Sequence, residues 1–62
     1  MTQFKFIGKS DSDYSGTILA LSCIKNIFIT EVSENIALIE MSTEFFEIFS
    51  HSLEYWGIIE LI

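Results

Sequence analysis

The chain has 62 residues, half of them apolar, with three Lys, nine Asp or Glu and a formal net charge of −6. At this length we expect one domain, 1–62, with a marginal core, since only about 60% of the unfolded surface is buried on folding. A single Cys23 and a single His51 exclude an internal disulfide and a zinc framework of Cys and His. The mean hydropathy of +0.46 predicts more apolar surface than such a core can hide, and therefore contact with another protein or a second copy.

The charge is unevenly distributed along the chain. All three Lys lie in the first 25 residues, whereas residues 26–62 carry seven Glu and no Lys or Arg. Nucleic acid phosphates are bound through Lys and Arg, so we expect no direct nucleic acid binding. The longest uncharged stretch has 11 residues and a membrane helix needs about 20, so we expect no membrane contact. The lack of a basic region followed by an apolar run predicts no signal peptide, and the unpaired cysteine favours a cytoplasmic location.

The first half of the chain predicts two strands separated by a loop. Residues 3–8 are rich in aromatic and β-branched side chains, which indicates a first strand. Turn-forming residues at 9–16 predict a loop that ends in a glycine with positive φ. The apolar run 17–24 predicts a buried strand; a short helix is the alternative, because periodicity does not decide on so short a run. Positions 25 and 26 then form a tight turn.

Residues 27–32 and 36–41 flank a short polar turn, which predicts a β-hairpin. If Val32 lies opposite Ile36, both hairpin faces are largely apolar, and one helix can cover only one of them. We therefore expect the second face to contact something else. The first face carries Ile27, Ile29, Ala37, Ile39 and Met41; the second carries Phe28, Val32, Ile36 and Leu38, with Thr30 and Glu40.

A helix followed by a last strand completes the predicted elements. Ser42 or Thr43 can cap a helix over 43–52, and the next residue, Glu44, favours its first turn. Residues 54–62 return to period two, which predicts a strand with Tyr55 and Trp56 on opposite faces. The helix has an apolar arc of Phe45, Phe46, Phe49 and Leu53, opposite Glu44, Glu47 and His51.

These elements predict an α+β domain. We expect a small antiparallel sheet of about five strands, in the order ββββαβ, with one short amphipathic helix at about 43–52. A partly closed barrel is the alternative.

One segment is similar to the start of a calcium loop of the EF-hand type. Asp11, Asp13 and Ser15 supply oxygens at positions 1, 3 and 5, and Gly16 stands at position 6. Position 12, normally a bidentate Glu, is Ser22. A calcium-binding module is therefore an alternative function, and turn capping by Asp and Ser is the other interpretation of the same residues. No other cofactor is expected.

Catalytic patterns are missing from the sequence. His51 stands among Glu44, Glu47 and Glu54, which suits a metal or a general base but also an ordinary solvated helix face. Arg, a glycine-rich loop and a nucleophile near a base are all absent, so we expect no enzyme. Cys23, in an apolar run, is expected to be buried and structural.

The excess of carboxylates suits the basic surface of a nucleic-acid-handling protein. We therefore expect a small, acidic, non-enzymatic protein that binds and inhibits or masks such a partner. Inhibitors of host defence from phages or mobile elements, and immunity proteins against nuclease toxins, share this size and charge. The expected partner-binding residues are Glu31, Glu34, Glu40, Glu44, Glu47 and Glu54, with Trp56 or Phe28 as the apolar anchor.

A structural role is the alternative. The chain would then be a subunit of a homo-oligomer or of a larger assembly, held by the second apolar sheet face and the last strand. The glutamates would serve only to keep the remaining surface soluble.

Overall fold

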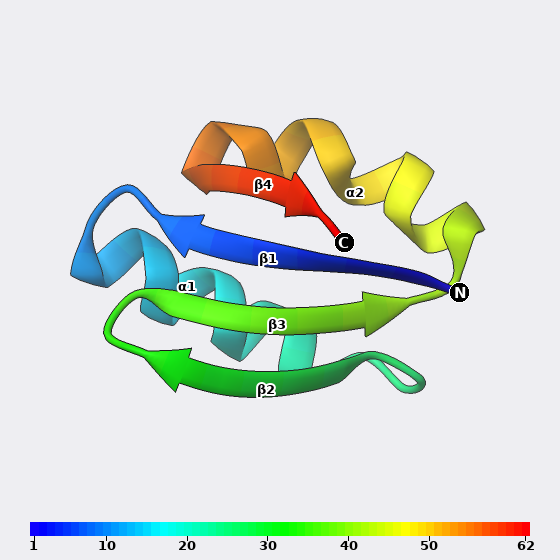
Figure 1. The fold of residues 1–62 in the computed structure, drawn as a ribbon, viewed down its shortest axis with the longest axis horizontal. Helices are drawn as coiled ribbons and strands as arrows, with labels where there is room; N and C mark the ends of the chain where they lie inside the picture. The colour runs from blue at the N-terminus through cyan, green and yellow to red at the C-terminus, as the bar shows by residue number, and fades with distance from the viewer.

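A computed structural model describes residues 1–62 as one antiparallel sheet with two helices on a single face (Figure 1). The strands lie side by side in the order β2-β3-β1-β4, which is the split βαβ, or ferredoxin-like, arrangement. The α+β class is confirmed, but the five-stranded sheet and the partly closed barrel are wrong. The elements are β1 (Thr2–Gly8), α1 (Asp11–Ser22), β2 (Phe28–Ser33), β3 (Ile36–Met41), α2 (Thr43–Trp56) and β4 (Gly57–Leu61).

Helix α1 replaces both the loop predicted at 9–16 and the strand predicted at 17–24. The Oγ of Ser10 accepts a hydrogen bond from the backbone N of Asp13 at 3.1 Å, which caps the helix. The polar residues read as turn formers are therefore N-terminal helix signals, and Gly16 lies within the helix without a positive φ. The buried positions have helical spacing: Tyr14, Thr17 and Leu21.

The predicted hairpin is confirmed. The pairs from Phe28–Glu40 to Glu31–Ala37 have the register that follows from placing Val32 opposite Ile36. A bulge shifts the last pair, so that Ser33 instead lies opposite Ile36. Asn35 has a φ of 60°, the left-handed conformation that the short turn requires, and Asn26 in the earlier predicted turn has a φ of 68°.

Helix α2 begins as predicted and ends later. The Oγ of Ser42 accepts from the backbone N of Phe45 at 3.1 Å. The helix continues to Trp56 because Leu53, 4% exposed, packs into the core in phase with the preceding turn. The strand predicted at 54–62 is therefore wrong over its first three residues. Gly57 begins β4, and a Cβ there would lie 2.6 Å from ring atoms of Phe6.

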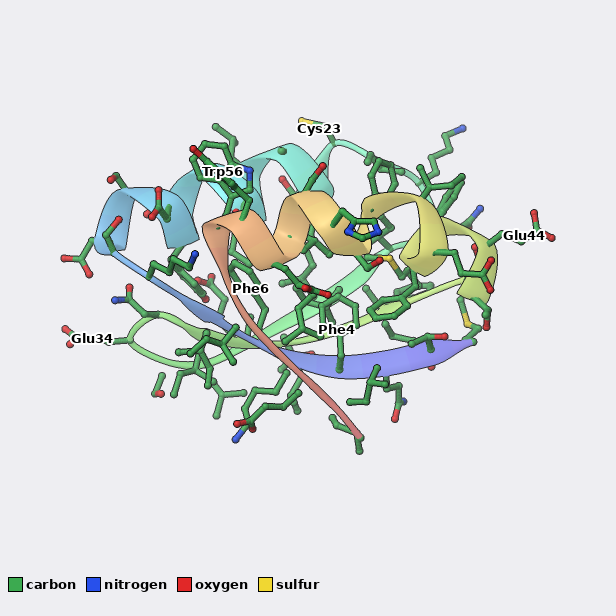
Figure 2. All side chains as sticks on the ribbon, turned by 90° about the horizontal axis from the view of Figure 1, so that it is seen from above. Phe4, Phe6, Cys23, Glu34, Glu44 and Trp56 are labelled. Carbon is green, nitrogen blue, oxygen red and sulfur yellow. The ribbon has the colours of Figure 1, made fainter.

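The core lies between the sheet and the helices. Figure 2 shows Phe4 and Phe6 beneath the helices, and both are fully buried. The rings of Phe4 and Phe46 lie 5.1 Å apart between centroids, which joins α2 to β1. One sheet face is thus covered and the other is open. The buried apolar residues are Phe4, Phe6, Tyr14, Leu21, Ala37, Ile39, Met41 and Leu53.

Candidate functional site

Three exposed carboxylates follow the solvent side of α2. Glu44, Glu47 and Glu54 occupy one helical stripe with the exposed His51, opposite the buried Leu53. We call these three glutamates the α2 acidic stripe. Neither Lys nor Arg occurs on α2, so no permanently charged base on the helix itself neutralises these carboxylates.

The other predicted partner-binding acids lie elsewhere. Glu34, in the turn between β2 and β3, and Glu44 project from opposite ends of the molecule (Figure 2). Glu40 is on β3, where its Oε2 accepts a hydrogen bond from Gln3 Nε2 at 3.2 Å. The carboxylates of the helix and of the hairpin turn therefore do not form one continuous patch. Their role in partner binding stays a prediction.

Glu31 has a structural contact with the core. Its Oε1 accepts a hydrogen bond from the Tyr14 hydroxyl at 2.8 Å, linking β2 to α1. Burial of the phenol, the hydrogen bond and the nearby negative charge together raise the pKa of Tyr14 to about 12. The phenol is therefore neutral at physiological pH and acts as a donor.

The residues of the predicted calcium loop lie on the first turns of α1. Alternate residues of a helix project in different directions, so the oxygens of Asp11, Asp13 and Ser15 do not converge on one point. The loop geometry on which that prediction depended is wrong. No group of three or more His, Cys, Asp or Glu side chains is placed to hold a metal ion.

The open face of the sheet carries a row of apolar side chains beside polar ones. We call it the outer sheet face; it is formed by the side chains that alternate with the buried ones along each strand. Ile58, Ile7 and Ile36 lie side by side across β4, β1 and β3. Phe28 and Ile58 are more than half exposed, at 57% and 56%. The remaining members are Gln3, Lys5, Thr30, Val32, Leu38, Glu40 and Glu60.

The few charges on the outer sheet face are already engaged. Lys5 Nζ lies 3.3 Å from Glu60 Oε1 across the β1–β4 pair, and Glu40 is held by Gln3. This face carries one of the three lysines and two of the nine acids. It is therefore close to neutral, whereas the rest of the molecule is strongly acidic.

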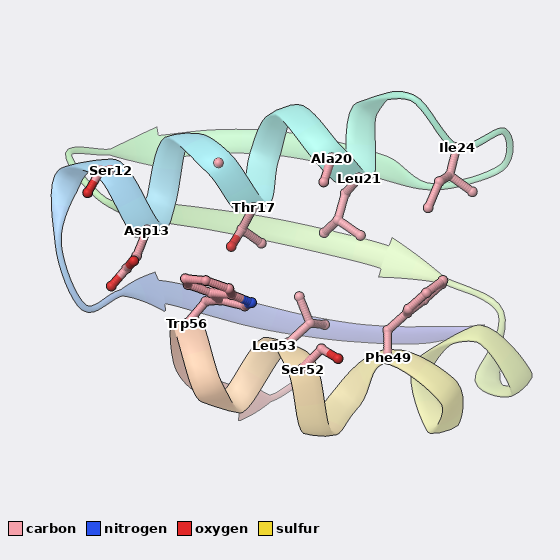
Figure 3. A pocket seen from close by; sticks show the side chains of 11 residues that line it. Ser12, Asp13, Thr17, Ala20, Leu21, Ile24, Phe49, Ser52, Leu53 and Trp56 are labelled. Atoms are coloured by element: carbon pink, nitrogen blue, oxygen red, sulfur yellow. The ribbon is translucent and has the colours of Figure 1, made fainter.

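A groove of about 350 Å³ separates α1 from α2 (Figure 3). Gly16 and Ala20 leave space on the α1 side, and Phe49 and Trp56 form much of the opposite wall. Trp56 is 44% exposed, so it is not the centre of the core, and its place on α2 at the groove keeps it off the outer sheet face. Cys23, which follows α1, is exposed, and the prediction of a buried thiol is wrong.

Part of the outer sheet face is predictable from the sequence. The alternation along the hairpin predicts a second apolar face with Phe28, Val32, Ile36 and Leu38, and these residues lie on the outer sheet face. Ile7 and Ile58 were not assigned to it, although the period-two alternation of their strands carries the same signal. What was missing was the position of β1 between β3 and β4.

None of the helices is both long enough and apolar enough to cross a membrane. Comparison with models of protein families, with curated proteins and with solved structures gives no match.

Proposed function

We propose that the chain is a non-enzymatic interaction protein that binds a larger, basic, nucleic-acid-handling protein through the α2 acidic stripe and thereby inhibits or masks it. The observation that carries this proposal is the row of three exposed glutamates on a 14-residue helix without Lys or Arg. An anti-defence or immunity role in the cytoplasm belongs to the same proposal.

The electrostatics of the stripe suit such a partner. A row of negatively charged carboxylates along a helix attracts the phosphate-binding surface of a basic protein and increases the rate at which the two proteins associate. At physiological salt the Debye length is about 8 Å, so the attraction acts at short range and weakens as salt is added. Glu44 is partly balanced by the positive end of the helix, which leaves Glu47 and Glu54 as the least compensated charges.

The scaffold holds these side chains in place. The Ser42 cap orders the first turn of α2. The Phe4–Phe46 contact near the start of the helix and the buried Leu53 near its end hold α2 against the sheet. A partner therefore meets a helix that is already ordered, and little backbone entropy is lost on binding.

The test is affinity capture of the tagged chain from lysate of its own host, eluted with rising salt. We expect one nucleic-acid-binding protein, released by moderate salt, and loss of that protein with the double variant Glu44→Lys and Glu47→Lys. Circular dichroism should be unchanged, because both positions are exposed.

The matched control is the double variant Asp11→Lys and Glu34→Lys, which changes the net charge equally at two exposed positions away from both the stripe and the outer sheet face. It should retain most of the binding. Equal loss in both double variants would mean that net charge, and not the stripe, controls capture. Normal binding by the Glu44 and Glu47 variant would disprove the acidic mechanism.

A further inference from the structure

We infer that the outer sheet face is the interface of a homodimer, in which two copies pack sheet against sheet. The inference goes beyond the proposed binding of a basic partner and does not depend on the α2 acidic stripe. Its starting point is that Phe28, Leu38 and Ile58, on three different strands, are 57%, 40% and 56% exposed on a face that no element of the chain covers.

Part of the face has the apolar pattern of a sheet that packs on both sides. Ile58, Ile7 and Ile36 form an uninterrupted apolar row across three strands, and Leu38 continues the apolar surface beside Lys5 on the next row. Two such faces can pack about 10 Å apart with their strands at roughly 30°. A two-fold axis through the face brings each row against its own copy, as an isologous interface requires.

Charge is what favours a second copy as the occupant. A chain of net charge −6 repels its own copies on most sides, but the outer sheet face holds only two of the nine acids. Both are already bonded, to Lys5 and to Gln3. Lys5 of one copy can also approach Glu40 or Glu60 of the other. A basic protein would find no free carboxylate on this face and is better matched to α2.

The area of the outer sheet face determines how tightly the two copies are expected to bind. Four strands spaced about 4.8 Å apart, each with about six residues, make a face roughly 20 Å on a side. This agrees with a molecule of 27 × 21 × 19 Å. Packing two such faces buries on the order of 1,000 Å² in total, near the lower limit for specific interfaces. We therefore expect a dissociation constant in the micromolar range rather than an obligate dimer.

The arrangement also fits the acidic exterior. With the sheets together, both helical layers face outward, so each copy still presents its α2 acidic stripe to a partner (Figure 2). The dimer would then offer two such stripes on opposite sides.

The experiment is sedimentation equilibrium of the untagged full chain from about 1 to 500 μM, at 150 and 500 mM salt. We expect a monomer–dimer equilibrium that added salt does not weaken, because apolar contacts hold the interface and salt screens the repulsion between two chains of net charge −6. Leu38→Lys should weaken dimerisation at least thirtyfold, since the interface would have to bury a second ammonium group directly opposite Lys5.

The matched control is Ile48→Lys, which replaces an exposed apolar residue of α2. It should change the dissociation constant of the dimer by no more than about twofold. Circular dichroism checks that each variant is folded, and Ile58→Lys replaces Leu38→Lys if that variant unfolds. A second readout needs no substitution: on dilution, amide chemical shifts should change for residues of the outer sheet face and not for those of α2.

A monomer at every concentration would overturn the inference. So would a dimer that Leu38→Lys weakens no more than Ile48→Lys, because dimers formed through the edge of β4 or through the helices leave Leu38 free. Capture of a basic partner by the Leu38→Lys monomer separates this inference from the proposed function, since either one can fail while the other holds.

Discussion

The two faces of the sheet are built from alternate residues of the same strands, yet they differ sharply in burial. Phe4, Phe6 and Ile39 are at most 1% exposed beneath the helices, whereas Leu38, the neighbour of Ile39 on β3, is 40% exposed on the outer sheet face. Both sheet faces carry apolar side chains, but the two helices cover only one of them. Only ten of the 62 residues are therefore buried.

The largest difference in stability is expected when a phenylalanine on each face of the sheet is replaced by alanine. Phe4→Ala removes a fully buried ring and should lower the free energy of unfolding by about 3–5 kcal/mol, enough to unfold much of a small domain. Phe28→Ala removes a ring that is 57% exposed and should cost less than about 1 kcal/mol. Urea unfolding at concentrations below the dimer constant measures both. Similar losses would mean that the outer sheet face is packed within the monomer.

Gly8 and Gly16 differ in how much room there is for a side chain. A Cβ at Gly8 would lie 2.5 Å from Cβ of Tyr14, where α1 approaches β1. Gly8→Ala should therefore lower the free energy of unfolding by about 1–3 kcal/mol. A Cβ at Gly16 meets nothing within 4 Å, and the residue is helical. Gly16→Ala should raise the free energy of unfolding by about 0.5–1 kcal/mol. Thermal unfolding of the pair tests both signs, and stabilisation by Gly8→Ala would contradict the close approach.

The hydrogen bond between Tyr14 and Glu31, on the covered side of the sheet, should contribute more to stability than the Lys5–Glu60 ion pair on the outer sheet face. Tyr14→Phe removes the 2.8 Å hydrogen bond to Glu31 and should lower the free energy of unfolding by about 1 kcal/mol. Chemical denaturation of this variant beside Glu31→Gln, which keeps an acceptor, measures the contribution. An unchanged stability in Tyr14→Phe would show that the contact is not formed in solution.

The same tyrosine predicts a dependence on alkaline pH. The pKa of Tyr14 is raised from 10.0 to about 12, so folding favours the neutral phenol. Its stabilising contribution is complete below pH 10 and is lost as the pH rises from 10 to 12. Tyr55→Phe leaves Tyr14 as the only tyrosine, and its absorbance at 295 nm should then rise with a midpoint near pH 12. A midpoint near 10 in the folded protein would contradict this environment.

The smallest effect is expected from the ion pair on the outer sheet face. Lys5 and Glu60 lie 3.3 Å apart, with side chains 40% and 54% exposed. Such pairs contribute little in water, so Lys5→Gln should change the free energy of unfolding of the monomer by less than about 0.5 kcal/mol. The change should vanish at 1 M salt. A larger, salt-resistant loss would indicate that the pair is shielded from solvent.

The sequence by itself determined the elements whose signals are local. The hairpin of β2 and β3 follows from two alternating runs around a turn that needs Asn35 in a left-handed conformation. The start of α2 follows from the Ser42 cap and the aromatic arc beyond it. In both, residues within a few positions of one another supply the hydrogen bonds and the apolar spacing.

Helix α1 is an element whose secondary structure the local sequence does not determine. Its polar start is compatible with both a loop and an N-cap. Leu19 is 70% exposed, so apolar residues lie on its outer side as well as on its buried side, and the run resembles a strand buried on both faces. Only packing of Tyr14 and Leu21 on the sheet decides for the helix.

Only the tertiary structure decided the positions of the surfaces. The insertion of β1 between β3 and β4 brings Ile7, Ile36 and Ile58 together, although they are far apart in the chain. The same arrangement sends Glu34 and Glu44 to opposite ends. Charge and apolar content are properties of the sequence. Their grouping into surfaces depends on which distant strands pair, because burial is optimised over the whole chain at once.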